Sequence, residues 1–349
     1  MGIQLSSLVE GKPLTIQELS NRKIAIDAFN WIYQFLTTIR GYDGEPLKDS
    51  QGRITSHLSG LFYRNINLLE AGAKLIYVFD GEPPHFKKKE IERRRELKKE
   101  AEIKRQEAIR DNRPEDALKY AKRTAVLDKD MIETAKELLT AMGICVIQAP
   151  SEGEAMASYI VKENQAWCIG SQDFDSLLYG ATRIARNLSI SSKRKYQKTE
   201  YTTPEPELLL LSDILESLEI NQEQLITLGI LIGTDYNIGG VKGLGPVKAL
   251  KLIKEKKTFE QTMKSVEWPF EISADDIFNF FKHPTIGKYE IEFPKINEEK
   301  IRNILSEHEF SQQRIDNGLA RLKGEAPKKK TKKNPDIGKQ STLSVFSGK

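Results

Sequence analysis

The chain has 349 residues, of which 30% are charged and 39% hydrophobic, enough for one large domain or two modest ones with a sizeable core. No apolar run reaches the roughly 20 residues of a membrane-spanning helix. The first residues also lack the basic and apolar segments of a secretory signal. We therefore expect neither a membrane-spanning helix nor a secretory signal.

The two cysteines, Cys145 and Cys168, lie in apolar segments and are expected to be buried free thiols, as in a reducing compartment. The four histidines lack metal-ligand spacing, which argues against a zinc site. The net charge of +4 hides an uneven placement of acids and bases along the chain.

Four apolar segments bounded by turn or helix-cap residues predict short buried strands: residues 23–27, 74–80, 143–150 and 166–171. Patterns over residues 57–72 and 128–143 predict helices between them. Repeated alternation of strand and helix favours an α/β domain. We therefore expect a central, mostly parallel sheet that is flanked by helices.

Residues 83–130 interrupt this alternation because they are rich in charged helix formers and nearly devoid of large apolar residues. Such a segment cannot form the usual core helix pair, so it predicts a solvated helical hairpin or a mobile arch over the domain. Within it, Lys87 and Arg94 are seven residues apart and share one helix face. Because they follow Asp80 closely, they could place cations on a bound phosphate. The alternative is a solvated, salt-bridged face.

Acidic residues follow the ends of the predicted strands. Because ligands bind outside the carboxyl ends of parallel strands, these acids are expected to converge on one crevice. Asp27 or Asp173 could instead cap the following helix, and Ser151 with Glu154 has the spacing of a capping box. Four strand ends that each carry an acid are harder to explain by capping alone. The strand-end acids are Asp27, Asp80, Glu152, Glu154, Asp173 and Asp175, and Asp235 follows a later apolar helix.

Such a cluster of acids has a chemical consequence. Carboxylates a few ångströms apart raise one another's pKa strongly unless cations are present. The arrangement therefore predicts divalent metal, and carboxylate with water ligands favours Mg²⁺ or Mn²⁺. Two such ions roughly 4 Å apart can activate a water and stabilise the leaving oxygen in phosphodiester hydrolysis. A Walker-type phosphate loop is absent from the sequence, so nucleoside triphosphate hydrolysis is disfavoured.

Residues 221–256 contain a glycine-rich turn, GGVKGLGP, followed by a predicted helix that begins at Pro246. Gly243 and Gly245 would let the backbone approach a phosphate closely, and N–H groups at the helix N-terminus would bind it. The pattern resembles a helix-hairpin-helix motif, which grips duplex DNA without reading its sequence. An ordinary glycine-rich turn between helices is the alternative.

The tail, residues 326–349, is basic and of low complexity, and is expected to be disordered. Near its end Gln340, Leu343 and Phe346 are three residues apart, which places all three on one side of a 3₁₀ turn. Such a short segment is typical of a peptide that docks in a partner groove, although chance spacing in a frayed tail would look the same.

Together these motifs resemble the flap endonuclease family, structure-specific 5′ nucleases of DNA replication and repair. The resemblance covers essentially the whole chain, and an anchor peptide so soon after the nuclease body is similar to the shorter archaeal-type members. The blocks that carry it, in chain order, are IAIDAFNWIY, TSHLSGLFYR, VFDGEPP, APSEGEAMA, SQDFDSLLYG and GTDYNIGGVKGLGPVKAL.

The resemblance implies that residues 1–325 form the nuclease domain and that the seven acids bind two Mg²⁺ ions, with Mn²⁺ as a substitute. It implies that Lys87 and Arg94 contact the scissile phosphate and that Tyr33 stacks on a base near the cleaved bond. Residues 83–130 would form the gateway and cap through which a single-stranded 5′ flap passes.

The resemblance also assigns Gly243 and Gly245, with the neighbouring lysines Lys242 and Lys248, to the hairpin that holds the downstream duplex. In the family this hairpin also binds a monovalent cation such as K⁺. The chain is expected to be a monomer by itself, with no membrane partner. A cytoplasmic location beside the nucleoid is expected for an archaeal member.

For the tail, the resemblance assigns residues 340–347 to a peptide that binds a sliding clamp of the proliferating-cell nuclear antigen type. Gln340, Leu343 and Phe346 match its pattern. Ser347 stands where a second aromatic residue is usual, which bears on the affinity for the clamp rather than on binding itself.

The sequence thus predicts an enzyme that cuts a 5′ flap at the junction of single- and double-stranded DNA, with some 5′–3′ exonuclease activity, in Okazaki fragment maturation and repair. A metal-activated water would attack phosphorus and leave a 5′-phosphate and a 3′-hydroxyl. Two alternatives remain open. A related nuclease of RNA would share the acids but lack the glycine-rich hairpin and the long arch. A non-catalytic, clamp-tethered DNA-binding scaffold would share the basic elements without needing seven acids.

Overall fold

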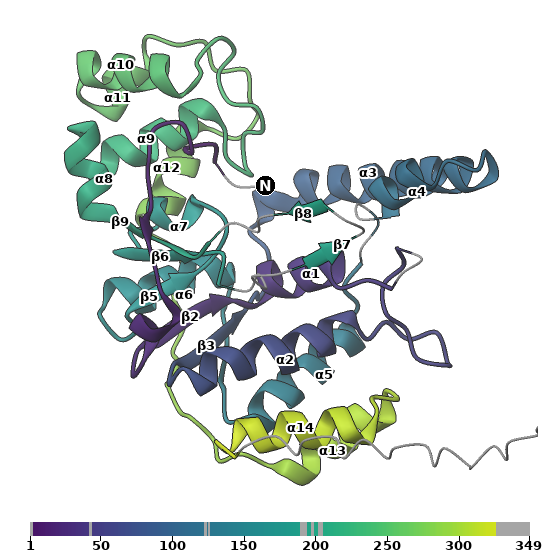
Figure 1. Ribbon diagram of the computed structural model, residues 1–349. Coiled ribbons are helices and arrows are strands. Elements are labelled where there is room, and N and C mark those ends of the chain that lie inside the picture. The colour runs from purple at the N-terminus through teal and green to yellow at the C-terminus, as the bar shows by residue number, and fades with distance from the viewer. Residues whose placement is uncertain are drawn as a thin grey trace, which may run out of the picture.

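The computed structural model describes residues 3–41, 44–121, 124, 126–188, 194–196, 199–201 and 205–325. Within them, seven strands form one sheet through the centre of the molecule, in the order β1-β9-β6-β5-β2-β3-β4 (Figure 1). These strands are β1 (Lys12–Pro13), β2 (Lys23–Asp27), β3 (Lys74–Phe79), β4 (Cys145–Gln148), β5 (Cys168–Gly170), β6 (Arg183–Arg186) and β9 (Glu207–Leu210). A separate hairpin pairs β7 (Arg194–Tyr196) with β8 (Thr199–Tyr201).

Adjacent strands β6, β5, β2, β3 and β4 run parallel, and β9 and β1 continue the sheet antiparallel at one edge. The prediction of a mostly parallel sheet is therefore confirmed, with the predicted strands at β2 to β5. Strands β6, β9 and β1, each of which spans four residues or fewer, were not predicted from the sequence. β4 and β5 are equally short, but they lie within the longer apolar segments 143–150 and 166–171, which predicted them.

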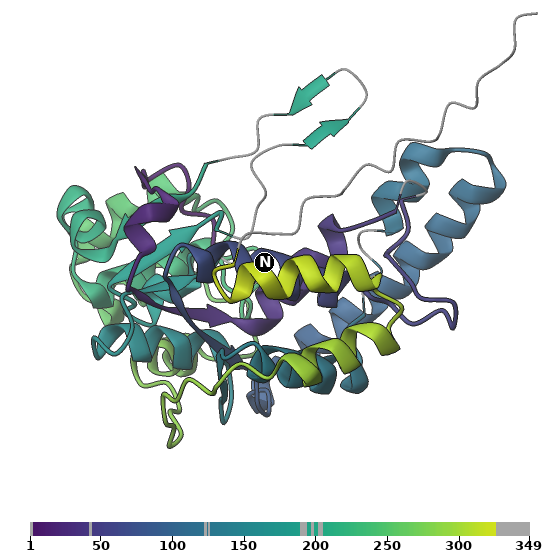
Figure 2. The same ribbon diagram turned by 60° about the horizontal axis from the view of Figure 1, so that its bottom comes forward.

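One face of the sheet is covered by α1 (Ala28–Thr38), α2 (Ser56–Glu70) and α5 (Lys129–Ala141). Outside them lie α13 (Glu298–Glu307) and α14 (Gln312–Leu322), at the bottom of Figure 1 and in front in Figure 2. Trp31, Phe62 and Tyr77 are fully buried in this half of the core, and burial of each such side chain contributes roughly 1.5–3 kcal/mol. α14 approaches α2 closely because Gly318 has no side chain: a Cβ there would lie 2.3 Å from Cε1 of Phe62.

The opposite face is covered by α6 (Gly153–Lys162), α7 (Asp175–Leu178) and α9 (Gln222–Ile232). Helix α9 is apolar on nearly every side, and Leu225, Leu228 and Leu231 are buried in it, as expected for a helix enclosed by others. Helices α10 (Pro246–Lys256), α11 (Phe259–Met263) and α12 (Ala274–Lys282) pack on α9, and α8 (Leu211–Leu218) packs on β9.

A long helical hairpin of α3 (Lys88–Arg110) and α4 (Pro114–Ala121) projects from this body (Figure 1). Of the 3₁₀ turns, η1 (Ile16–Leu19) precedes β2, and η2 (His85–Lys87) leads directly into α3. The buried apolar residues of the hairpin are small alanines, whereas Ile103 and Ile109 are 60% and 56% exposed. This confirms the predicted helical hairpin, and seven residues, 122–128, separate α4 from α5.

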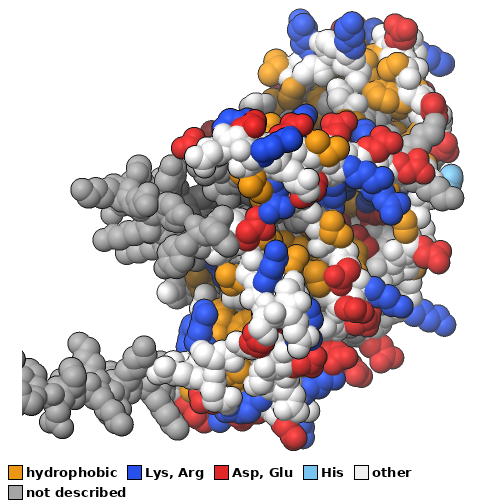
Figure 3. Space-filling view, turned by 90° about the vertical axis from the view of Figure 1, so that its right-hand side faces the viewer, with side chains coloured by type: hydrophobic (Ala, Val, Ile, Leu, Met, Phe, Trp, Pro, Cys, Tyr) orange, Lys and Arg blue, Asp and Glu red, His pale blue; other side chains and the backbone are white. Residues whose placement is uncertain are grey.

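The α3–α4 hairpin is held mainly by polar contacts. On the face of the molecule shown in Figure 3, lysine and arginine side chains are interspersed with acidic ones. Arg105 pairs with Glu102 of its own helix and with Glu45 in the loop before α2. Arg40 donates a hydrogen bond of 3.0 Å to the carbonyl oxygen of Ala121 at the end of α4.

In the described part of the chain, every helix is too short or too polar to cross a membrane.

Candidate active site and DNA-binding elements

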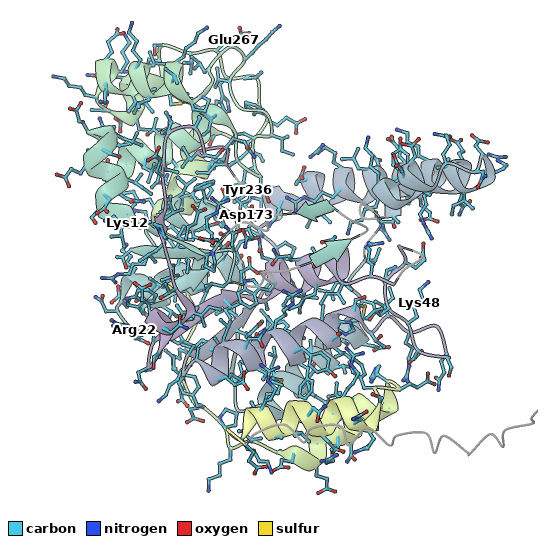
Figure 4. The ribbon with its side chains drawn as sticks, viewed as in Figure 1. Lys12, Arg22, Lys48, Asp173, Tyr236 and Glu267 are labelled. Carbon is cyan, nitrogen blue, oxygen red and sulfur yellow. The ribbon has the colours of Figure 1, made fainter. Side chains whose placement is uncertain are left out.

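The acids that the sequence singled out line one pocket of about 1020 Å³ at the carboxyl ends of the parallel strands. The labelled Asp173 and Tyr236 mark its position, beside the base of the α3–α4 hairpin (Figure 4). The predicted convergence is therefore confirmed. The seven carboxylates are those of Asp27, Asp80, Glu152, Glu154, Asp173, Asp175 and Asp235.

Two of these carboxylates also accept hydrogen bonds from the N-termini of helices. The same side chain can therefore cap a helix and line the pocket. Asp27 is the N-cap of α1, and its Oδ1 accepts the N–H of Asn30 at 3.1 Å. Asp80 accepts the N–H of Gly153, the first residue of α6, at 2.7 Å. A Cβ on Gly153 would lie 2.7 Å from Oδ1 of Asp80, so only glycine admits this contact.

For Glu154, the capping-box interpretation is wrong. The N-cap of α6 is Glu152, not Ser151, and its side chain makes no capping hydrogen bond. The Glu154 carboxylate points into the pocket instead, where Oε1 accepts hydrogen bonds from Ser176 Oγ at 2.5 Å and Ser171 Oγ at 3.4 Å. The spacing matched the motif, but the chain turns into α6 one residue later than the motif requires.

The last strand-end pair, Asp173 and Asp175, is held by segments far away in the sequence. Asp173 accepts a hydrogen bond of 2.8 Å from the side-chain amide of Asn30 in α1. Asp175 accepts the backbone N–H of Ile3 at 2.8 Å, a contact across 172 positions. The N-terminal segment therefore helps to hold a carboxylate of the pocket, which the sequence did not indicate.

Four of the pocket carboxylates, those of Asp27, Asp80, Glu154 and Asp175, resist ionisation. Burial raises the pKa of Asp27 to about 8, and the nearby charges of Asp80 and Asp173 add to this effect. Burial also raises the pKa of Asp80 to about 6 and that of Asp175 to about 7. The pKa of Glu154 lies well above its ordinary value, through burial and then the charge of Asp175. Cations are therefore needed before all of these groups carry charge at neutral pH.

Two cations from the base of the hairpin partly meet this need. Lys87 Nζ lies 2.5 Å from Oε2 of Glu152, and Arg94 Nη2 lies 2.5 Å from Oδ2 of Asp235. Burial by itself would lower the pKa of Lys87, but the charge of Glu152 reverses this and raises it. Burial would also raise the pKa of Asp235, but nearby positive charges, including Arg94, lower it below its ordinary value. Lys87 is the last residue of η2 and the N-cap of α3, so it stands at the helix start rather than within the helix.

The donor set fits a hard divalent ion, because the pocket offers carboxylate oxygens and no histidine or cysteine. Among the residues that the structure describes, no three acidic, histidine or cysteine side chains are yet arranged to hold an ion together. Two of the carboxylates are held instead by Lys87 and Arg94.

Tyr33 lies in α1 at the wall of the pocket and is half-buried. Lys98 Nζ lies 5.0 Å from the centre of its ring, close enough for a cation–π contact. Lys98 lies one helical turn beyond Arg94 and lines the pocket as well. We did not single out Lys98 from the sequence, although its spacing from Arg94 was a usable signal.

The predicted helix-hairpin-helix consists of α9, the turn at residues 233–245 and α10. Gly243 has φ +84°, a left-handed conformation that favours glycine, and Gly245 is the N-cap of α10. A Cβ at either glycine would meet no atom within 4 Å, so the outer side of the turn is open. Lys242 and Lys248 are exposed on either side of it. The described geometry thus offers free N–H groups and positive charge to an approaching backbone.

Comparisons with known proteins agree with this arrangement. The XPG N-terminal domain matches residues 1–101, and the XPG I-region matches residues 143–235. Flap endonuclease 1 of Thermococcus onnurineus is 48% identical over 100% of both chains, and that of Pyrococcus abyssi is 49% identical over 98% of this chain and 97% of the relative.

Solved structures give the same result. Flap endonuclease-1 from Methanococcus jannaschii has a TM-score of 0.72 and 39% identity, and the match covers 92% of this chain and 98% of that one. The catalytic core of Rad2 in complex with DNA substrate has a TM-score of 0.64 and 25% identity, over 89% of this chain and 96% of that one.

These matches define the class: a metal-dependent, structure-specific nuclease that hydrolyses phosphodiester bonds in DNA. The relatives match from end to end at nearly half identity, which narrows the class further. The chain belongs to the flap endonuclease family and is a structure-specific 5′ flap nuclease. The segment predicted to bind a sliding clamp, with Gln340, Leu343 and Phe346, lies outside the described residues.

Proposed function

We propose that the seven pocket carboxylates hold two Mg²⁺ ions, which Mn²⁺ can replace, and that this site cuts a 5′ flap at the junction with the duplex. The observation that carries the proposal is the gathering of seven acids in one pocket, where burial raises the pKa of Asp27 to about 8. Such a site is costly without divalent cations. When bound, Mg²⁺ supplies Lewis acidity for the phosphodiester and lowers the pKa of a water.

Side chains of the hairpin base and of α1 then bind and orient the DNA. Lys87 and Arg94 release Glu152 and Asp235 as metal arrives and donate hydrogen bonds to the scissile phosphate. In the complex with DNA, the ring of Tyr33 stacks on a base next to the cleaved bond, and this contact replaces its cation–π contact with Lys98. The single-stranded flap passes the α3–α4 hairpin, within residues 83–130, and some 5′–3′ exonuclease activity follows from the same geometry.

The duplex next to the flap lies on the helix-hairpin-helix, residues 221–256. Gly243, Gly245 and the N-terminus of α10 receive a phosphate, and the exposed Lys242 and Lys248 add charge. A monovalent cation such as K⁺ would be held at this turn and would add positive charge near the phosphate. Binding through backbone contacts carries no sequence information, so recognition depends on the shape of the branched DNA.

The cleanest test uses three labelled substrates: a 5′ flap DNA, a blunt duplex and a single-stranded RNA. Each is incubated with Mg²⁺ and with chelator, using the wild-type enzyme and Asp175→Ala. We expect a single cut at the flap junction that requires Mg²⁺, and at least a 10³-fold slower cut by Asp175→Ala with flap binding largely retained. A comparable rate on RNA favours the RNA nuclease. Tight flap binding without any metal-dependent cut favours the DNA-binding scaffold.

The nuclease domain, residues 1–325, is proposed to cut DNA without the tail, and the tail, residues 326–349, is proposed to bind a partner. Gln340, Leu343 and Phe346 bind the sliding clamp, so Phe346→Ala should remove stimulation by an archaeal clamp and leave cleavage without clamp unchanged. Sedimentation should find the chain monomeric without partners. The proposed setting is the cytoplasm, in replication and repair. Clamp stimulation that survives in Phe346→Ala contradicts the assignment of the peptide.

A further inference from the structure

Glu90 is a buried acid at the start of the otherwise exposed α3–α4 hairpin. It lies in the first turn of α3 and is 8% exposed. Its Oε2 accepts a hydrogen bond of 2.8 Å from Arg93 Nε, and its Oε1 accepts one of 2.7 Å from Arg94 Nε. Arg93 Nη2 adds a longer contact of 3.3 Å to Oε1. Two guanidinium groups therefore enclose one carboxylate.

This arrangement differs from the ordinary ion pairs of a helix surface. In the pairs Arg113–Asp116 and Arg105–Glu102 of the same hairpin, the acidic side chains are 43% and 39% exposed, whereas the Glu90 side chain is 7% exposed. Exposed pairs of this spacing contribute roughly 0.3–0.5 kcal/mol and exchange readily with water. A buried carboxylate keeps fixed partners because leaving it without them is costly.

Two acidic side chains hold the Arg94 guanidinium group through different nitrogens. Nε is bound to Glu90 within α3, while Nη2 is bound to Asp235 in the loop after α9. The contact with Asp235 involves a proposed metal ligand and is lost when cations and a phosphate enter. The contact with Glu90 uses Nε alone, so it can persist while the Nη groups of Arg94, which lines the pocket, remain available to a phosphate.

We propose that Glu90 is a positioning residue for the hydrolytic step, and that it fixes the plane of the Arg94 guanidinium group so that its Nη groups meet the scissile phosphate. This inference rests on the proposed role of Arg94. Without Glu90, the Arg94 side chain rotates about its terminal torsions and remains paired with acids of the pocket. Binding of flap DNA is then little changed, whereas the rate of the chemical step falls.

The test is a double-mutant cycle on Glu90 and Arg94, read out as the single-turnover rate constant and the Kd for flap DNA. Glu90→Gln should slow the single-turnover step about tenfold with less than a twofold change in Kd. In an Arg94→Ala background the same substitution should have no further effect. Glu90→Asp, which keeps the charge, should recover part of the rate. Glu92→Gln is the matched control because Glu92 is an exposed acid two residues away, and its rate should stay at the wild-type value.

The outcomes separate this inference from the proposed function. If Arg94→Ala itself cuts at a normal rate, the role of Arg94 is wrong, and this inference fails with it. If Arg94→Ala is slow but Glu90→Gln is not, or if their losses multiply, only the positioning role of Glu90 is overturned. Arg93→Ala is the remaining arm. A loss equal to that of Glu90→Gln would show that Glu90 acts through Arg93, which also overturns the inference, while thermal melting of each variant checks that the fold persists.

Discussion

The two halves of the candidate active site, the acids on the sheet and the cations on the α3–α4 hairpin, are built in opposite ways. Asp27 and Asp80 follow fully buried strands and are fixed by backbone N–H groups of α1 and α6. Lys87 and Arg94 lie on a projecting hairpin whose apolar contacts are small, and they are fixed by ion pairs. The negative half is therefore part of the core, whereas the positive half is attached to it by contacts that can be exchanged.

The difference shows how such a site combines accuracy with access. Backbone hydrogen bonds and packing keep the carboxylates in place when the pocket is filled or empty. Ion pairs at a hairpin can move from a carboxylate to a phosphate without any loss of core packing. The acids should therefore govern whether the reaction occurs, and the hairpin cations should govern how well the phosphate is held.

The sharpest test of the comparison is Asp27→Asn, which keeps the cap on α1 and removes a buried ionisable group. We expect cleavage to fall at least 10³-fold, because a ligand of the proposed metal site is lost. The melting temperature of the metal-free protein should rise, since burial raises the pKa of Asp27 and its ionised form is disfavoured. Exposed Asp130 offers a matched control, Asp130→Asn. A lower metal-free melting temperature in Asp27→Asn would break the comparison.

Arg94→Ala should act in the opposite direction on stability. The single-turnover rate should fall about 10²-fold through loss of a donor to the phosphate. The metal-free protein should melt at a lower temperature, because Asp235 and Glu90 each lose an ion pair. Arg95→Ala removes the same charge from the neighbouring position of the pocket wall. Equal effects of both substitutions would show that general positive charge, rather than the contacts of Arg94, is what matters.

Buried His57 predicts that the stability of the protein core depends on pH. It lies in α2, is 2% exposed, and its ring nitrogens have no hydrogen-bond partner among the described residues. Burial lowers its pKa to about 4, and nearby His308 lowers it further while Asp128 opposes this. In the unfolded chain His57 therefore takes up a proton near pH 6.5, whereas in the folded protein it stays neutral at that pH. The free energy of unfolding keeps its full value above pH 6.5 and falls by about 2–3 kcal/mol towards pH 4.

Urea unfolding at pH 7 and pH 4.5 measures this loss. His57→Leu should flatten the difference between the two pH values, and His283→Leu, at an exposed histidine, should leave it unchanged. An undiminished loss of stability in His57→Leu would assign the acid sensitivity to other groups.

The smallest expected effect concerns competition between Lys87 and metal. Because Lys87 Nζ lies 2.5 Å from Glu152, its removal should free that carboxylate and raise the apparent affinity for Mg²⁺ by a few fold. The melting temperature as a function of Mg²⁺ concentration measures this affinity. Lys99→Ala, also at the pocket wall, removes the same charge and should change the affinity less. Weaker binding of Mg²⁺ by Lys87→Ala would contradict the exchange of ion pairs.

The parts of this protein that depend on local pattern could be predicted from the amino-acid sequence. The apolar runs that end in Asp27 and Asp80 are strands, and the charged segment between residues 83 and 130 forms a projecting hairpin. A buried strand needs a continuous apolar run, and a hairpin without large apolar residues cannot enter the core, so both are written in neighbouring residues. The acids at the strand ends followed from the same rule.

The partners of these residues depend on long-range packing and could not be predicted from the sequence. It brings Ile3 to Asp175, assigns Glu154 to Ser176 rather than to a helix cap, and encloses Glu90 between Arg93 and Arg94. Burial and pKa depend on everything that packs around a group, including segments more than a hundred residues away. Local pattern therefore located the acids, while long-range packing determined their charge and their bonds.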